Sequence, residues 1–198
     1  MNGSDGTRPR ATCNARRGRL FSPATNIQVS VMPRKTHEYH VTVEWIGNTG
    51  HGTSSYTRYA RDYVSYPTRG TPSPTLSTPT HFLHGSADPS FLGDNHRWNP
   101  EELLVSSVSA CHMLWYLHLC ADAGIVVSSY LDHAKGIMET RNDGSGAFTR
   151  ICLAPAISVQ TGADMTLAQE LHLRAHEKCF IAASLKTPVE IDPKIVTV

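Results

Sequence analysis

The chain has 198 residues, of which 40% are hydrophobic and 18% are charged, and its formal net charge at pH 7 is +1. This length fits one domain with a sizeable core plus extensions, and the near-neutral charge gives no electrostatic argument for binding nucleic acid or an acidic membrane surface. The five cysteines are widely spaced and form no CxxC motif, which argues against a secreted disulfide framework and favours a reducing, cytoplasmic compartment.

The N-terminal segment differs in composition from the rest of the chain. Residues 1–32 contain five arginines against one acidic residue, Asp5, and they lack the apolar stretch of a secretory signal. An organelle transit peptide, a disordered tail and sequence upstream of the true start all fit this composition. We predict that residues 1–36 are a disordered or artefactual extension in which Cys13 has no function, and that residues 37–198 form one folded domain.

The first expected element is a β-strand followed by a turn. Apolar and polar residues alternate in EYHVTVEW, residues 38–45, with the period of a half-buried strand. The glycine-rich residues 47–52, GNTGHG, predict a hairpin turn. Residues 65–80 contain four prolines and little apolar content, so we expect a loop there.

Residues 99–124 carry the clearest helix signal. Asn99 is a good N-cap, Pro100 suits the first helical position, and two glutamates occupy the first turn, where the helix dipole favours negative charge. Gly124 is a natural C-cap, which gives a helix of roughly 23 residues. Apolar residues lie on nearly every face, but serines and histidines interrupt the run, so we predict a buried core helix and not a membrane span.

The rest of the chain predicts an α+β fold. Residues 147–159 predict a strand that pairs with the segment before the turn NDGSG, and residues 189–198 predict a final strand. Between them a helix is expected to begin at Thr166, whose spacing to Gln169 matches a capping box. The order of strands and helices is not that of βαβ repeats, which favours the α+β class.

The cysteines allow several interpretations. Cys111 and Cys120 are nine residues apart in the predicted helix, so about 100° per residue sets them on opposite sides with a rise of roughly 13 Å between them. A disulfide needs Cα atoms within about 7 Å, so these two cannot pair in an intact helix. A metal site is a second interpretation, because His172, His176 and Cys179 could line one helix face, although their spacing matches no zinc motif.

Two further interpretations concern individual thiols. Free cysteine often serves as a small buried hydrophobe, and this fits Cys120 and Cys152 best. Redox chemistry instead requires a thiolate, an activating cation and a resolving thiol. Cys111 lies among apolar residues, which disfavour a thiolate, so a positive group from another element would have to stabilise it. Residue types alone leave these interpretations open.

Two segments carry a family resemblance. NPEELLVSSVSACHMLWYLHLCADAG, residues 99–124, and HEKCFIAASLKTPVEI, residues 176–191, closely resemble the OsmC/Ohr family of thiol-dependent hydroperoxide reductases, within an OsmC-like branch. The resemblance covers nearly everything from Glu38 to the C-terminus. Its specific signal is an N-P-E-E-L helix start with a cysteine near mid-helix, then a second cysteine before a small-residue segment and a final strand.

The resemblance implies a cysteine-based peroxidase that uses no bound cofactor. Cys111 matches the peroxidatic cysteine and Cys179 the resolving cysteine, so a peroxide would convert Cys111 to a sulfenic acid, and Cys179 would condense with it to a disulfide that an external dithiol reduces. Glu101 matches the family glutamate that holds an activating arginine. That arginine would stabilise the thiolate and polarise the peroxide.

The chain departs from the family pattern at this arginine. The family places it on the early hairpin, whose tip here has His51 and no arginine. Arg58, Arg61 and Arg97 are the nearby replacements, and we select Arg61 first and Arg97, which adjoins the helix start, second. The departure affects the expected efficiency and substrate choice, and leaves the expected fold unchanged.

The resemblance also implies an assembly: an intertwined homodimer in which a long central helix packs against antiparallel sheets and each active site lies at the interface. Our first functional hypothesis is a cytoplasmic peroxidase, active in the stress response, that reduces organic hydroperoxides. The alternative is a dimer of the same fold that binds a small apolar or electrophilic ligand without efficient turnover, which the missing hairpin arginine favours.

Overall fold

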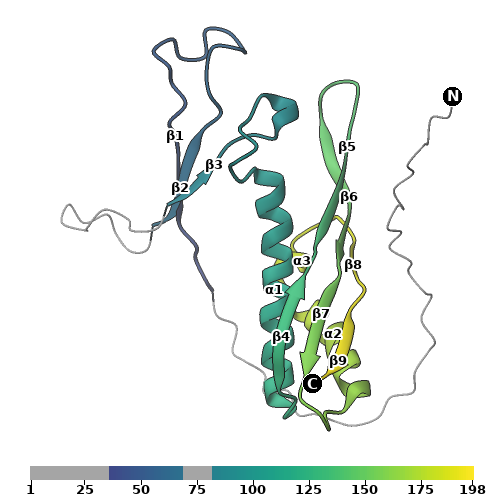
Figure 1. Ribbon diagram of the computed structural model, residues 1–198. Helices are drawn as coiled ribbons and strands as arrows, with labels where there is room; N and C mark the ends of the chain where they lie inside the picture. Colours follow the sequence, from purple (N-terminus) through teal and green to yellow (C-terminus); the bar gives the residue numbers. More distant parts are fainter. Residues whose placement is uncertain (1–35, 69–81) are drawn as a thin grey trace, which may run out of the picture. The chain divides into compact units, whose positions relative to one another are not determined.

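Figure 1 shows the computed structural model of the protein, which describes residues 36–68 and 82–198. The chain divides into two compact units, of which the N-terminal unit comprises described residues 36–68 and 82–104, and the C-terminal unit comprises residues 105–198. The predicted extension, apart from Thr36, lies outside the described residues together with Cys13 and most of the predicted proline-rich loop.

Three strands form the sheet of the N-terminal unit: β1 (Val41–Trp45), β2 (Tyr63–Pro67) and β3 (Leu83–Gly85). They pair antiparallel in the order β1-β2-β3. A short 3-10 helix, η1 (Pro89–Phe91), follows β3 and begins at Asp88, whose side chain accepts a hydrogen bond from the Ser90 N–H. The predicted first strand is therefore present, and the predicted turn lies in its connection to β2.

The apolar face of β1 is exposed. Val41 and Val43 have relative exposures of 68% and 64%. The alternating pattern identifies this face as apolar, but among the described residues it is not covered as the prediction of a half-buried strand required. The alternating pattern indicates the polarity of each strand face but not what packs against it. An exposed apolar face is a surface that a partner can cover.

The helix α1 (Pro100–Asp122) begins where the sequence predicted. The Asn99 side-chain oxygen accepts the Glu102 backbone N–H at 2.8 Å, and the Glu102 carboxylate accepts the Asn99 N–H at 3.2 Å, so the two residues cap the helix reciprocally. Gly124 follows the helix with φ of 70°, a conformation that glycine adopts without steric cost. Residues from Val105 onward belong to the C-terminal unit.

Six strands form two sheets in the C-terminal unit: β4 (Val127–Asp132), β5 (Lys135–Thr140), β6 (Gly146–Leu153), β7 (Pro155–Val159), β8 (Val189–Ile191) and β9 (Lys194–Thr197). The strand orders are β4-β7-β9 and β5-β6-β8. Three longer segments thus pass from one sheet to the other, and the prediction of single strands over 147–159 and 189–198 missed two of the breaks. Pro155 and Pro193 lie at these breaks, where a residue without an N–H interrupts a ladder.

Both sheets of the C-terminal unit are mixed. The pairs β4–β7 and β5–β6 are antiparallel, whereas β6–β8 and β7–β9 are parallel. The expectation of antiparallel sheets is correct for the N-terminal unit and wrong for these two. The reason lies in the connection between β7 and β8, which contains two helices, because such a long crossover can return the chain in its original direction.

These two helices are α2 (Met165–Lys178) and α3 (Phe180–Ala183), with Cys179 between them. The side chain of Asp164 accepts the Leu167 backbone N–H at 3.0 Å. Asp164 is therefore the N-cap of α2, and the capping box predicted at Thr166 is wrong by two residues. Aspartate and threonine are both favoured caps, so residue type alone does not choose between neighbours.

The core of the C-terminal unit consists of two clusters. α1 contributes Tyr116, Leu119 and Cys120 to the first, which also contains residues of β7 and α2. It contributes Val108 to the second, with Ile151 and Leu153 of β6. By length and composition α1 could also cross a membrane, a test that core helices of soluble proteins pass as well. Its contacts with both clusters match the predicted core helix.

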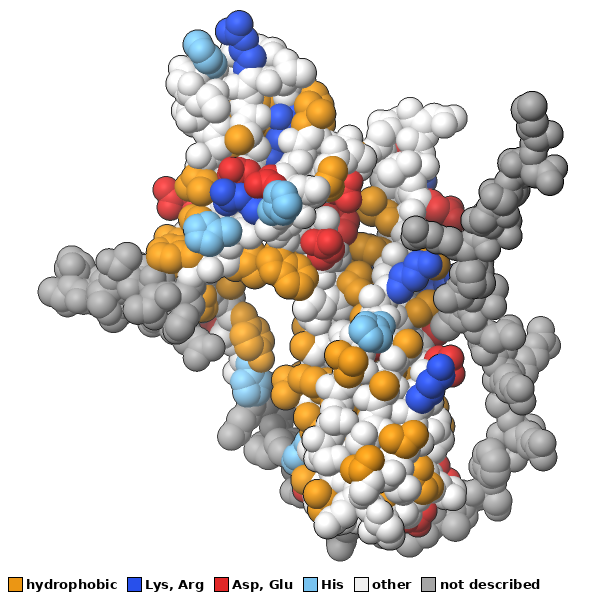
Figure 2. Space-filling model, viewed as in Figure 1, with side chains coloured by type: hydrophobic (Ala, Val, Ile, Leu, Met, Phe, Trp, Pro, Cys, Tyr) orange, Lys and Arg blue, Asp and Glu red, His pale blue; other side chains and the backbone are white. Residues whose placement is uncertain are grey.

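Part of α1 is nevertheless exposed. Leu114 has a relative exposure of 63%, and Leu131 on β4 is also exposed. Figure 2 shows hydrophobic side chains on the surface of the part of the molecule that holds α1 and β4. α1 therefore has a buried face in the core of its unit and an exposed apolar face.

Candidate active site

Cys111 lies near the middle of α1 and is half-buried. Its neighbour His112 is buried, so the two side chains leave the helix in different directions. The thiol is therefore on the helix flank between the buried and the exposed faces. A half-buried thiol can meet a small substrate while most solvent is kept away.

Cys179 occupies the junction between α2 and α3 and is only 1% exposed. Its backbone N–H donates to the His176 carbonyl at 3.2 Å, which closes the last turn of α2. Its sulfur accepts the Ala182 backbone N–H at 3.5 Å and so caps α3. The backbone of two helix ends thus fixes the position of this thiol.

The thiols of Cys111 and Cys179 interact with each other, and both are free cysteines. The pKa of the Cys179 thiol is raised to about 11, chiefly by burial and further by hydrogen bonding and charge from Cys111. Backbone hydrogen bonds from Ala182 and Ile181 act in the opposite direction. Cys179 therefore keeps its proton at neutral pH, including when Cys111 is ionised.

The other two described cysteines are separate from this pair. Cys120 is fully buried in the first core cluster, and burial raises the pKa of its thiol. Cys152 is buried on β6 with its sulfur 3.7 Å from the Glu190 carboxylate. Both are free, and the continuous helix keeps Cys120 from Cys111, as the spacing predicted.

His172 on α2 has a partner on α1 that the sequence did not indicate. His172 Nδ1 lies 3.0 Å from His112 Nε2, and both side chains are buried. In the part of the chain that the structure describes, no group of three or more His, Cys, Asp or Glu side chains is arranged to hold a metal ion. The metal interpretation of His172, His176 and Cys179 therefore has no geometric support.

Aromatic side chains adjoin the thiols in sequence and pack together. Trp115 lies one turn after Cys111, and Phe180 directly follows Cys179. Their rings meet edge to face with centroids 5.6 Å apart, and Lys178 Nζ lies 5.5 Å from the centre of the Trp115 ring. Phe180 is largely exposed. This apolar surface beside the cysteine positions is suited to an organic group.

Glu101 lies in the first turn of α1, in the N-terminal unit. Its Oε2 atom is buried and has no hydrogen-bond partner among the described residues. Burial raises the pKa of Tyr63, and the charge of Glu101 raises it further, which places this carboxylate near the tyrosine. A buried carboxylate oxygen without a partner is costly, and a cation would satisfy it.

Arg61 is in the same unit and has only neutral partners. Its guanidinium lies 4.2 and 4.4 Å from the ring centres of Tyr59 and Tyr56, and it donates to the backbone carbonyls of both tyrosines. Within the described part of this unit, no ion pair joins it to Glu101. The positive charge of Arg61 is therefore held by aromatic faces and is not neutralised by a carboxylate.

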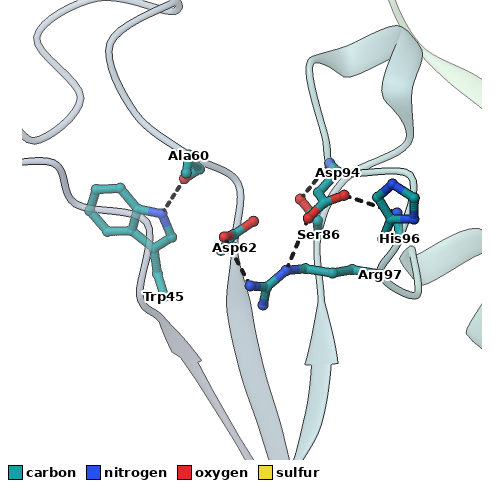
Figure 3. A network of polar contacts seen from close by, with 7 residues as sticks. All are labelled: Trp45, Ala60, Asp62, Ser86, Asp94, His96 and Arg97. Carbon is teal, nitrogen blue, oxygen red and sulfur yellow. Dashed lines mark hydrogen bonds and ion pairs between the residues drawn. The ribbon is translucent and has the colours of Figure 1, made fainter.

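Arg97 has the opposite environment, as Figure 3 shows. Its guanidinium lies 3.4 Å from the Asp62 carboxylate and 3.3 Å from the Asp94 carboxylate. The same Asp94 accepts the His96 backbone N–H, while its own N–H donates to the Ser86 hydroxyl. Two carboxylates thus neutralise Arg97, and the Asp94–Ser86 hydrogen bond ties the residue after β3 to the segment before α1.

An open cavity of about 350 Å³ lies within the N-terminal unit. Arg61 and Tyr63 line it together with Pro100, the residue before Glu101, and aromatic rings of Trp45 and Tyr59 form much of its wall. The cavity therefore brings the unneutralised arginine and the start of α1 to the same space.

Comparison with known protein families matches the sequence to one of them. The family model for OsmC-like proteins matches residues 93–194, more than half of the chain. The chain belongs to the OsmC-like family. The search of the curated proteins finds no match.

Solved OsmC-like structures share the fold. An OsmC-like protein of unknown function from Vibrio cholerae is 28% identical with a TM-score of 0.65, over 81% of this chain and 100% of that chain. An organic hydroperoxide resistance protein from Elizabethkingia anophelis is 17% identical with a TM-score of 0.56, over 84% and 100% of the chains. The organic hydroperoxide resistance protein OsmC from Legionella pneumophila is 15% identical with a TM-score of 0.56, over 82% and 98%.

Sequence reasoning selected Cys111, Cys179, Glu101 and Arg61, and the structure brings the first two together and places the others in the N-terminal unit. Sequence reasoning missed the His112–His172 contact and the aromatic contact of Trp115. A buried histidine was visible only as a polar residue in an apolar helix, and that signal does not identify a partner sixty residues away.

Proposed function

We propose that this OsmC-like protein is a thiol-dependent peroxidase that reduces organic hydroperoxides. The observation that carries the proposal is the pair of interacting, reduced thiols of Cys111, in α1, and Cys179, at the junction of α2 and α3. Membership of the OsmC-like family supports it, since some solved structures with this fold are organic hydroperoxide resistance proteins.

The environments of the two thiols support different roles. Cys111 is half-buried and accessible to a small molecule, which suits the peroxidatic thiol. Cys179 is buried and keeps its proton because burial and Cys111 raise its pKa, which suits a resolving thiol that reacts second. The assignment is the one that the family resemblance implied.

The reaction balances with these two thiols and a dithiol. The Cys111 thiolate attacks the terminal oxygen of the hydroperoxide, so that an S–O bond forms, the O–O bond breaks and the alkoxide takes a proton to leave as an alcohol. The Cys179 sulfur then attacks the sulfenic sulfur, an S–S bond forms, and the hydroxyl leaves as water with the proton of Cys179. An external dithiol reduces this disulfide and is itself oxidised.

Arg61 is the stronger candidate for the activating cation. Its charge is not neutralised by a carboxylate, whereas Arg97 already pairs with Asp62 and Asp94. Glu101 has a buried oxygen free to hold such a cation among the described residues. In the proposed mechanism Arg61 is the activating cation, whose charge stabilises the thiolate and the developing negative charge on the peroxide oxygen.

A homodimer is part of the proposal. The apolar faces of β1 and of α1 are both exposed, at Val43 and Leu114 for example. Exposed apolar faces of this kind are typical of surfaces that a partner covers. A cytoplasmic location also belongs to the proposal, because the thiols must be returned to the reduced state by a dithiol.

The alternative function is ligand binding without efficient turnover. The cavity of the N-terminal unit favours it, because aromatic rings line the cavity and Arg61 is engaged there by tyrosines. An apolar or electrophilic ligand could occupy this space while the thiols remain reduced.

Peroxide consumption separates the two functions. Purified protein is mixed with cumene hydroperoxide or hydrogen peroxide, with dithiothreitol as the reductant, and the loss of peroxide is followed. The peroxidase account predicts many turnovers per protein chain and a faster reaction with cumene hydroperoxide. Saturable binding of cumyl alcohol, measured by calorimetry, without peroxide loss above the rate of dithiothreitol alone would support the alternative and contradict the proposal.

A further inference from the structure

A pair of stacked histidines lies buried between α1 and α2. His112 Nε2 and His172 Nδ1 are 3.0 Å apart, and the ring planes are 15° from parallel. Tyr116 stacks on the other side of the contact, with its ring centre 3.8 Å from that of His172. All three side chains are at most 2% exposed. The pair is thus a polar contact inside a hydrophobic interface between two helices.

The pair is neutral at neutral pH. Burial lowers the pKa of His112 to about 4 and that of His172 to about 3, and each also has another histidine nearby, His176 beside His112. One ring therefore donates an N–H to the bare nitrogen of the other. The remaining ring nitrogens, His112 Nδ1 and His172 Nε2, have no hydrogen-bond partner among the described residues.

This arrangement is costly compared with an apolar contact. Whichever ring donates, one buried N–H is left without an acceptor among the described residues, which is unfavourable. Two leucines at these positions would fill the interface without that cost. A buried polar pair can instead specify one register, because a shift of either helix breaks its only hydrogen bond.

The relative position of α1 and α2 that the histidine pair fixes also sets the relative position of the two thiols. His112 directly follows Cys111 on α1, and His172 lies two helical turns before Cys179 along α2. The histidine contact and the thiol contact therefore join the same two chain segments. A displacement of α2 along α1 would move both contacts together.

We infer that His112 and His172 are positioning residues for the disulfide-forming step, whose hydrogen bond holds α1 and α2 in the register from which the Cys111 and Cys179 sulfurs join. The inference rests on the proposed function, since it gives the pair a role in the second step of that reaction. The histidines contact neither the peroxide nor the sulfenic sulfur from which water leaves. They act through the helices that carry the thiols.

The test measures the effective concentration of the two thiols toward each other. The full-length protein is equilibrated in buffers of reduced and oxidised glutathione, and the fraction with a Cys111–Cys179 disulfide is measured by mass spectrometry after alkylation. No peroxide is present, so the result does not depend on peroxidase activity.

Amide side chains provide matched variants. A glutamine amide reaches about as far as histidine Nε2, whereas an asparagine amide reaches only as far as Nδ1. Because His112 uses Nε2, we expect His112→Gln to keep the effective concentration within about threefold of the wild type. We expect His112→Asn to lower it at least about tenfold, which is about 30 mV for this two-electron couple.

A double variant and a control complete the test. The variant His112→Leu with His172→Leu replaces the polar pair by an apolar one, and we expect it to fold yet to show the same loss of about tenfold. Ile151→Val removes one methyl group from the second core cluster and controls for a general loss of stability. We expect its effective concentration to stay within about threefold of the wild type.

The outcomes separate the inference from the proposed function. Wild-type effective concentrations in folded His112→Asn and in the double leucine variant would overturn the inference, even if the protein consumes peroxide. A loss in those variants with retention in His112→Gln would support the inference, even if peroxide is not consumed. If His112→Asn does not fold, the double leucine variant decides.

Discussion

The two units hold polar groups of opposite character. In the C-terminal unit the buried groups between α1 and α2 are neutral: burial lowers the pKa of His112 and His172 and raises that of Cys179. The N-terminal unit instead holds charges, with Arg61 on tyrosine rings and Glu101 near Tyr63. The C-terminal unit thus holds the Cys111–Cys179 pair, and the N-terminal unit holds Arg61 and no described cysteine.

In the proposed function these two parts of the chain have different tasks. A buried, neutral setting keeps the second thiol protonated and held by backbone, so that it does not compete with Cys111 for the peroxide in the first step. Charge stabilisation of the first step must then come from outside that setting. In the proposed mechanism, peroxide reduction depends on both units, and disulfide formation depends on the C-terminal unit alone.

The largest expected effect comes from removing the Cys111 thiol, in the C-terminal unit. We expect Cys111→Ser to lower dithiol-dependent consumption of cumene hydroperoxide by at least about a thousandfold, because the nucleophile is lost. Cys179→Ser should still react once and stop at a sulfenic acid, which dimedone traps and mass spectrometry detects. Full turnover by Cys111→Ser would show that the thiol pair is not the site.

The next effect concerns the charges of the N-terminal unit. We expect Arg61→Gln to slow sulfenic acid formation about a hundredfold, the usual loss when a stabilising donor is removed. Arg97→Gln is the matched control, because its charge is already paired with Asp62 and Asp94, and its rate should stay within about threefold of the wild type. The rate is measured by stopped-flow mixing with cumene hydroperoxide.

The reverse ranking of the two arginines would transfer the activating role to Arg97. Equal and small effects of both would show that charges of the N-terminal unit do not act on Cys111. In that case the division of work between the units would be wrong.

A smaller effect tests the neutral setting of the C-terminal unit. The pKa values of His112 and His172 in the folded protein, about 4 and about 3, lie below the usual value of 6.5. The unfolded chain therefore binds more protons as the pH falls below 6.5, and stability decreases from there toward pH 4. We expect the free energy of unfolding to fall by roughly 2 kcal/mol per histidine between pH 7 and pH 5.

Urea unfolding at the two pH values measures this change. The double leucine variant at positions 112 and 172 should lose most of the pH dependence, since neither position then binds protons. An equally steep dependence in that variant would mean that other groups cause it.

The smallest effect concerns the helix starts. Asp164→Ala should cost about 1 kcal/mol because the N-cap of α2 is lost, whereas Thr166→Ala, inside the helix, should cost much less. Neither residue belongs to the proposed active site, so Asp164→Ala should consume peroxide at the wild-type rate once folded. Thermal unfolding measures the difference, and a larger loss in Thr166→Ala would restore the cap predicted from the sequence.

The sequence predicts the helix α1 better than it predicts the sheets. Asn99, Pro100 and Gly124 are local signals that each act through the backbone beside them, so the bounds of α1 follow from them directly. Pro155 and Pro193 mark the breaks of the strands locally, but the choice of pairing partners does not follow from them, and the parallel pairing depends on a crossover through α2. Pairing of this kind is not encoded in a short stretch of residues.

The same distinction holds for the site. The cysteine positions follow from a family resemblance that spans both segments, but the environment of each arginine does not. Arg61 and Arg97 have the same side chain, and only the structure shows that one meets tyrosine rings and the other two carboxylates. The His112–His172 contact joins positions sixty residues apart and likewise required the packed helices.

Disulfide mapping after oxidation tests the central claim most directly. Reduced wild-type protein and Cys111→Ser are each treated with one equivalent of cumene hydroperoxide, and the disulfides are identified by mass spectrometry. The account predicts a Cys111–Cys179 disulfide that forms rapidly in the wild type and is absent from the variant. Thiols that stay free in the wild type, or that oxidise without pairing, would contradict it.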